Sequence, residues 1–127
     1  MSNIETAKKF IAACETGDAE NLIPFFAEDA IYHNIPMEPV TGKDAIRATL
    51  SMFMGNAEEV IFDTPFIAET ANGDVLTERL DKFRYGENWL KIRVMGTFEF
   101  DAEGKITHWR DYFDMGEFQS QMAAIAG

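Results

Sequence analysis

The sequence predicts an α+β fold in which helices wrap a curved, mainly antiparallel sheet. Two observations lead to this class. Several stretches before residue 55 carry apolar residues at helical spacing, and after Gly55 the pattern changes to alternation interrupted by turn residues. The length of 127 residues fits one domain, 1–127, with a core and room for a pocket on the concave face of the sheet.

The helices are predicted from apolar spacing and from capping residues. The first covers 2–17, with Ser2 or Asn3 as its cap and Gly17 as its stop. A short second helix begins near Asp18, and Pro24 limits or kinks it. The segment "KDAIRATLSMFM" forms an amphipathic helix, and "GEFQSQMAAIA" closes the chain as a short helix.

The strands are predicted from alternation and from the turns that separate them. "AIYHNIP" is a strand closed by Pro36, and the loop "MEPVTG" follows it. Asn72-Gly73 is a strong hairpin signal between "EEVIFDTPFIAET" and "DVLTERLDKFRY". Turns at 86–88 and at "DAEG" then join "WLKIRVMGTFEF" and "ITHWRDYFD" into a meander.

Composition narrows the function classes. The 11 Lys and Arg residues against 22 Asp and Glu residues give a formal charge of −11, which argues against nucleic acid or an anionic membrane as a partner. No apolar run approaches the roughly 20 residues of a membrane span. The N-terminus lacks a signal-peptide core, and the single Cys14 fits a reducing cytoplasm, so a cytoplasmic location is expected.

Charged residues lie on a strand face that is otherwise apolar. In "ITHWRDYFD" alternation groups Asp111 with Trp109 and Phe113, while Arg110 points the other way. In "TERLDKF" it groups Arg79 and Asp81 with apolar neighbours. Because an unpaired buried carboxylate costs several kcal/mol, roughly, we expect Arg79 to lie between Asp81 and Asp111.

Two readings of this set remain open. Buried Asp–Arg pairs are often only structural, and the strand pattern alone favours that reading. However, two carboxylates share one cation here, so they should titrate in separate steps and leave one acid protonated and one ionised. That arrangement is what general acid–base chemistry requires.

For the other polar residues, too, a structural role competes with a functional one. Tyr32 and Asn34 share a strand face and could hold a water beside an ionised carboxylate, although such residues are more often plain hydrogen-bonding partners. Cys14 lies on an apolar helix face and is predicted to be core. His33 and His108 fall on the opposite strand faces, at the surface or at a dimer contact, and no metal-ligand set surrounds them.

At these residues the chain resembles the limonene-1,2-epoxide hydrolase family, within the cone-shaped domains related to nuclear transport factor 2 and the SnoaL-like polyketide cyclases. The matching segments are "YHNIP", "GKDAI", "TERLD", "GTFEF" and "GKITHWRDYFD". The resemblance implies a strongly curved mixed, mainly antiparallel sheet forming a cone, with the N-terminal helices packed over it. It also implies direct addition of water to a small apolar epoxide, cyclic or terpene-like, giving a vicinal diol, in a homodimer without cofactor or metal.

The resemblance assigns roles position by position. It makes Asp111 the general base, Asp81 the general acid and Arg79 the bridge between them, with Tyr32 and Asn34 helping to hold the water. It places six residues in the substrate pocket: Trp109, Phe113, Phe83, Ile92, Val94 and Phe118. The chain departs from the family pattern at Phe83, where a smaller aliphatic is common, and at Lys82 and Arg93, which add charge to the outer face.

Two other functions stay in competition. A proton shuttle like that of ketosteroid isomerases or polyketide cyclases would need one carboxylate and an oxyanion hole, which leaves the second acid in excess. A non-catalytic dimer that binds a small ligand would need no water-holding Tyr32–Asn34 pair.

Overall fold

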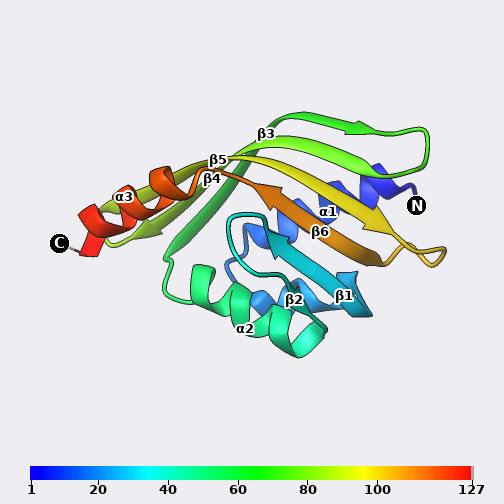
Figure 1. Ribbon diagram of the computed structural model, residues 1–127, viewed down its shortest axis with the longest axis horizontal. Helices are drawn as coiled ribbons and strands as arrows, with labels where there is room; N and C mark the ends of the chain where they lie inside the picture. The colour runs from blue at the N-terminus through cyan, green and yellow to red at the C-terminus, as the bar shows by residue number, and fades with distance from the viewer. Residues whose placement is uncertain (127) are drawn as a thin grey trace.

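The computed structural model describes residues 1–126 and confirms the predicted α+β class. Three helices accompany a single curved sheet (Figure 1), with bounds α1 Asn3–Cys14, α2 Lys43–Met54 and α3 Met115–Ala126. The strands are β1 Phe26–Asn34, β2 Val40–Thr41, β3 Glu59–Glu69, β4 Val75–Tyr85, β5 Asn88–Phe100 and β6 Ile106–Tyr112. No helix within residues 1–126 is long and apolar enough to cross a bilayer.

The sheet is mixed and runs in the order β2-β1-β6-β5-β4-β3. The meander β3 to β6 is antiparallel throughout, whereas β1 pairs with β6 in parallel, with Asn34 opposite Asp111. The parallel pair brings an early strand beside the last one. Polar residues from both ends of the chain can therefore meet on the concave face.

The second predicted helix is wrong. The segment after Asp18 forms two 3₁₀ turns instead, η1 Ala19–Asn21 and η2 Ile23–Phe25, and β1 already begins at Phe26. Asp18 caps the first turn by accepting a hydrogen bond from the Glu20 N–H at 3.0 Å. Pro24 has no N–H to donate, so an α-helix cannot propagate through it and the chain turns into the sheet. The loop predicted at 37–42 likewise contains the two-residue strand β2.

The first helix begins where predicted but ends at Cys14, three residues before the predicted stop at Gly17. Ser2 caps α1 by accepting a hydrogen bond from the Glu5 N–H, and α2 covers the predicted "KDAIRATLSMFM". The Asn72-Gly73 signal marks the connection between β3 and β4, but only Gly73 has a positive φ, at +88°. The Thr70 N–H donates to the Asp74 carbonyl, so the loop is longer than a two-residue turn.

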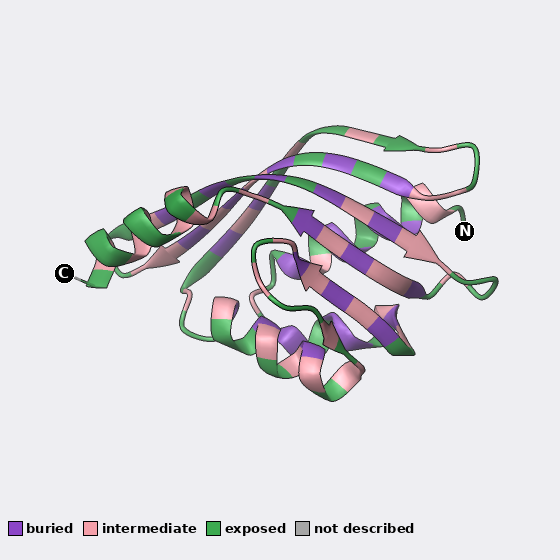
Figure 2. Cartoon of the chain, viewed as in Figure 1, coloured by how far each residue is buried: buried purple, intermediate pink, exposed green. Residues whose placement is uncertain are grey.

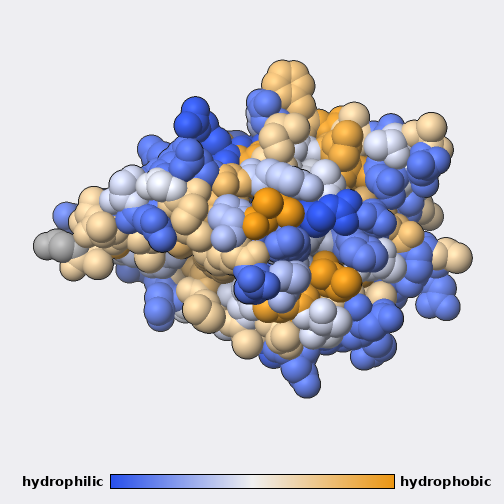
Figure 3. All heavy atoms as spheres, in the orientation of Figure 1, coloured by the Kyte–Doolittle hydropathy of each residue, from blue (hydrophilic) through white to orange (hydrophobic). Residues whose placement is uncertain are grey.

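The core lies between the concave face of the sheet and helices α1 and α2, and buried residues alternate with exposed ones along β4 and β5 (Figure 2). Phe10 of α1 makes edge-to-face contacts with Phe26, Phe98 and Trp109. None of the described residues of α3 is buried. Figure 3 shows a largely hydrophilic or mixed face with pale, mildly apolar atoms over α3, while the most hydrophobic atoms lie in separate patches near the centre and the upper right.

Candidate active site

The buried polar cluster is assembled across three neighbouring strands. Arg79 and Asp81 lie on β4 and Asp111 lies on β6, with β5 between them. The register places Gly96 of β5 opposite both Thr77 and Asp111. Because residues two apart point to the same face, the side chains of Arg79, Asp81 and Asp111 all rise from the concave side, as the alternation predicted.

Arg79 joins the two carboxylates. Its Nε and Nη2 donate to Asp81 Oδ1 and Oδ2, both at 2.9 Å, and Nη2 also donates to Asp111 Oδ2 at 2.8 Å. Its Nη1 donates to Thr77 Oγ1 at 3.1 Å, and its Cζ lies 5.2 Å from the centre of the Phe62 ring. With only 2% of Arg79 exposed, the guanidinium compensates two buried carboxylates as expected.

Gly96 provides the space for this bridge. A Cβ atom at Gly96 would overlap the Arg79 guanidinium and would lie 2.5 Å from Asp111 Oδ1. Any side chain on β5 at this point would therefore block the path from Arg79 to Asp111. Gly96 lies in the "GTFEF" segment, but sequence reasoning gave it no role because its effect depends on the register of three strands.

Asp111 has a second donor that sequence reasoning missed. Trp109 Nε1 donates to Asp111 Oδ1 at 2.8 Å, so both oxygens of Asp111 are engaged. The Trp109 ring also stacks on Tyr32 at 4.2 Å with an interplanar angle of 14°. Trp109 lines the cavity as predicted, and it also orients Asp111. The signal for this contact was the position of both residues on one strand face, two apart.

Tyr32 and Asn34 form a pair at the same cavity. The Tyr32 hydroxyl donates to Asn34 Oδ1 at 3.2 Å, and both side chains are buried. Because the Asn34 oxygen accepts from Tyr32, the amide nitrogen of Asn34 supplies the N–H donors of this pair.

Burial and charge set the protonation of the cluster. Burial and, to a smaller extent, the negative charge of Asp111 raise the pKa of Asp81 to about 6, against the opposing effect of the Arg79 charge. Burial opposes the charge on Arg79, but the two carboxylates raise its pKa well above the usual range. Burial raises the pKa of Tyr32, so its hydroxyl stays protonated. The cluster therefore combines a permanent cation with an acid that titrates near neutrality.

The cluster opens into an inner chamber of about 40 Å³. On this scale roughly 10–15 Å³ holds one water, so the chamber has room for a water and a small reacting group. All six predicted pocket residues line it, together with Tyr32, Asn34, Asp81 and Asp111, while Arg79 lies behind it. Sequence reasoning missed five further lining residues: Leu50, Phe53, Met54, Phe62 and Leu90.

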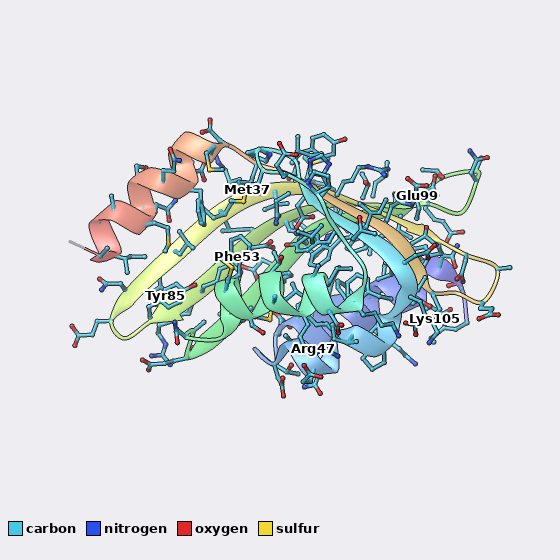
Figure 4. All side chains as sticks on the ribbon, turned by 60° about the horizontal axis from the view of Figure 1, so that its bottom comes forward. Met37, Arg47, Phe53, Tyr85, Glu99 and Lys105 are labelled. Atoms are coloured by element: carbon cyan, nitrogen blue, oxygen red, sulfur yellow. The ribbon has the colours of Figure 1, made fainter. Side chains whose placement is uncertain are left out.

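An outer chamber of about 390 Å³ adjoins the inner one. The two share a throat formed by Tyr32, Asn34, Phe53, Leu90 and Phe118. The remaining walls of the outer chamber are Met37, Glu38, Val40, Thr49, Met52, Tyr85 and Met122. Met37, Phe53 and Tyr85, labelled in Figure 4, come from three separate elements, namely the loop after β1, α2 and the end of β4.

The remaining candidate residues lie outside these chambers. Cys14 is fully buried in the core, and burial raises the pKa of its thiol. His33 Nε2 lies 2.9 Å from the Met37 carbonyl oxygen, and His108 Nδ1 lies 3.2 Å from Thr107 Oγ1. Among residues 1–126, no group of three or more His, Cys, Asp or Glu side chains is placed to hold a metal.

The charges predicted on the outer face form surface ion pairs. Lys82 Nζ lies 2.7 Å from Asp63, and Arg93 lies 2.8 Å from Glu117 of α3. Arg110, which alternation turned away from Asp111, pairs with Glu99 at 2.7 Å.

Comparisons with known proteins converge on one family. Residues 1–124 match the model of the limonene-1,2-epoxide hydrolase catalytic domain. The epoxide hydrolase EphG of Mycobacterium tuberculosis is 32% identical over 107 residues, which are 84% of this chain and 69% of that protein.

Solved structures agree with this match. An LEH-like epoxide hydrolase of M. tuberculosis superposes with a TM-score of 0.80 at 26% identity, covering 96% of this chain and 90% of the other. SalBIII, an epoxide hydrolase/cyclase-like enzyme with a role in pyran ring formation in the polyether salinomycin, has a TM-score of 0.81. It is 18% identical, with 91% of this chain and 92% of that chain covered, and at this identity the likeness shows the fold alone.

Proposed function

The chain belongs to the limonene-1,2-epoxide hydrolase family, and we propose that it adds water directly to a small apolar epoxide to give a vicinal diol. The observation that carries the proposal is the bridge of Arg79 between Asp81 and Asp111 at one narrow, largely apolar chamber. An epoxide is strained, but water is a weak nucleophile and an alkoxide is a poor leaving group. Hydrolysis therefore gains from a base and an acid acting together.

Asp111 is the proposed base. Trp109 and Arg79 each donate to one of its oxygens, and these two hydrogen bonds hold the carboxylate in place at the chamber. Asp111 takes one proton from water while the water oxygen bonds to the ring carbon. Asn34 and Tyr32 line the same chamber and position this water. A positioned base contributes about 10²- to 10⁴-fold.

Asp81 is the proposed acid. The pKa of about 6 that burial gives it leaves a protonated fraction at neutral pH. It donates that proton to the epoxide oxygen as the carbon–oxygen bond breaks, so epoxide and water become the diol. Asp111 then carries a proton and Asp81 a negative charge, and exchange through water restores both before the next turnover.

A single-turnover experiment in ¹⁸O-water tests direct attack. With enzyme in excess over cyclohexene oxide, the first diol formed should carry the label and the protein should carry none. Unlabelled diol with ¹⁸O later appearing in Asp81 or Asp111 would mean that a carboxylate attacked the ring, and direct addition of water would be wrong.

Substitution of each acid tests the assigned pair. Asp81→Asn and Asp111→Asn should each lose at least about 10²-fold in kcat/KM, and the double variant should be little worse than either single one because the acids act as a unit. Asp63→Asn, which removes a surface carboxylate paired with Lys82, is the matched control and should keep activity. Near-wild-type hydrolysis by Asp111→Asn would remove the base assignment.

We also propose that the protein is a cytoplasmic homodimer joined through the outer face of the sheet. Phe66, Glu78, Met95 and Tyr112 form one row in register across β3, β4, β5 and β6. Three of the four, Phe66, Met95 and Tyr112, are exposed large apolar or aromatic residues, and exposed apolar patches mark protein contacts. Light scattering should give twice the chain mass, and Met95→Lys should give the monomer mass. A monomeric wild-type protein would contradict the dimer.

A further inference from the structure

The outer chamber is much larger than the chamber that holds the acids, with about 390 Å³ against about 40 Å³. A compact epoxide placed against Asp81 and Asp111 would fill the inner chamber and leave the outer one to solvent. Space that opens directly from a reacting site through a defined throat suits a substrate that extends beyond its reacting group.

Apart from Asn34, the throat residues are aromatic or aliphatic. Phe118 of α3 lies 5.9 Å from Phe53 of α2 and 6.0 Å from Phe113, ring centre to ring centre, in edge-to-face geometry. Leu90 of β5 lines both chambers as well. A chain passing from the acids to the outer chamber would therefore contact apolar surface along most of its path.

The hydroxyl groups of the outer wall beyond the throat are already engaged. The Tyr85 hydroxyl donates to the Phe53 carbonyl at 2.7 Å, and the Thr49 hydroxyl donates to the Ala45 carbonyl at 2.9 Å. The other wall residues include Met37, Met52 and Met122, whose flexible side chains adapt to irregular apolar shapes. This wall offers apolar contact and little hydrogen bonding.

One charged side chain, that of Glu38, lines the outer chamber. Glu38 is the only ionisable acid or base other than Tyr32 and Tyr85 among the described residues that line the outer chamber, and it is exposed. A carboxylate at the far end of a substrate would meet this negative charge and the net charge of −11 of the whole chain.

We propose that the outer chamber is a second substrate subsite, which holds an elongated, uncharged apolar substituent of the epoxide. This inference rests on the proposed function, because it places the epoxide ring at Asp81 and Asp111. It specifies the substrate class as neutral epoxides with a flexible apolar chain, and it excludes epoxides whose chain ends in a carboxylate as preferred substrates.

A chain-length series tests the subsite. The substrates are 1,2-epoxybutane, 1,2-epoxyhexane, 1,2-epoxyoctane and 1,2-epoxydecane, with cyclohexene oxide as the compact reference. We expect kcat/KM to rise about two- to fourfold per added methylene, the gain of burying apolar chain. A flat series with active hydrolysis of cyclohexene oxide would overturn the subsite and leave the proposed function intact. Loss of all epoxide hydrolysis would overturn the proposed function, and the subsite with it.

Substitutions at Met122 and Glu38 test whether the chain of the substrate lies in the outer chamber. Met122→Gln should flatten the chain-length series, whereas Met115→Gln, the same change on the same helix at a residue that lines neither chamber, should leave its slope unchanged. The acid 9,10-epoxydecanoate should react at least about tenfold more slowly than 1,2-epoxydecane, and Glu38→Gln should narrow this gap. Equal slopes in the two methionine variants would show that the chain lies elsewhere, and a gap unaffected by Glu38→Gln would show that Glu38 does not select against the acid.

Discussion

Asp81 and Asp111 at the inner chamber, and Arg79 that joins them by hydrogen bonds, are each 5% exposed or less. The outer chamber, by contrast, is lined by methionines and by residues of α3, a helix with no buried described residue. The inner groups lie on β4 and β6 of one sheet, with only β5 between them. The outer groups come from a loop, two helices and strand ends. The two chambers therefore differ in how firmly their walls are fixed.

This difference separates two requirements of the same site. Proton transfers need donors and acceptors held to a fraction of an ångström, and buried polar networks are stable only when every member is satisfied. Binding of an apolar chain needs contact area, which flexible thioethers can supply in several arrangements. Changes in the inner chamber should therefore affect rate strongly, and changes in the outer chamber should shift selectivity.

Removal of the shared cation should have the largest effect. Arg79→Gln should lower kcat/KM by at least about 10³-fold and lower the free energy of unfolding by about 3–5 kcal/mol, because it leaves two buried carboxylates without a cation. Arg79→Lys should rescue little, since one ammonium cannot serve both acids and Thr77 at once. Urea denaturation and steady-state kinetics measure both quantities.

Arg84→Gln is the matched control, because Arg84 pairs with Glu58 and Glu59 at the surface. It should change the free energy of unfolding by about 1 kcal/mol or less and should leave turnover unchanged. Full activity in Arg79→Lys would mean that a point charge suffices and that the bridging geometry is not required.

Filling the space above β5 should have the second largest effect. Gly96→Ala places a methyl group where the Arg79 guanidinium and Asp111 now lie, so the bridge must shift and kcat/KM should fall about 10²-fold or more. The measurement is kcat/KM at a temperature where circular dichroism shows the variant folded. Gly116→Ala on the exposed helix α3 is the control, and equal activity in the two variants would argue against a role for Gly96.

The pH profile should show a smaller but diagnostic effect. The pKa of Asp81 is raised by burial to about 6, and an acid must be protonated to donate, so kcat/KM should fall about tenfold per pH unit above pH 6. Because this folded-state pKa lies above the ordinary value of 3.8, the folded protein binds more protons between the two values, and stability should fall as pH rises through that window. A flat profile from pH 6 to 9 would contradict Asp81 as the acid.

Loss of the contact that anchors α3 to β5 should have the smallest effect. The Gln121 side chain accepts from the Lys91 N–H at 2.7 Å and donates to the Lys91 carbonyl at 2.8 Å, which fixes α3 to β5. Gln121→Ala should speed hydrogen exchange at Lys91 and raise KM for long-chain epoxides about two- to fivefold, with kcat for cyclohexene oxide little changed. Gln119→Ala, at an exposed position of the same helix, should do neither.

The alternation of side chains along a strand was enough to predict the cluster of Arg79, Asp81 and Asp111. Alternation put Arg79, Asp81 and Asp111 on the concave face, and the cost of a buried charge paired them before any contact was known. The need for Gly96 and the bond from Trp109 to Asp111 depend on strand register and on side-chain direction, which alternation does not give.

The outer chamber was not predictable for a different reason. Phe53 and Tyr85 meet there because α2 packs near the end of β4, and the sequence contains no periodic signal for that contact. The turns at 19–25 were predicted as a helix because their apolar residues have helical spacing, and Pro24 decided the outcome. Tertiary packing, rather than local pattern, determines these parts.

The parallel pairing of β1 with β6 has a consequence for how activity is acquired. It sets Asn34 beside Asp111 and lets the Ile35 N–H donate to the Asp111 carbonyl, so the site joins an early strand to the last one. Contacts between distant parts of a chain form slowly, because a long loop must close first. During synthesis, the site is incomplete until β6 has left the ribosome. On refolding of the whole chain, catalytic activity should return at the rate of the slowest structural phase.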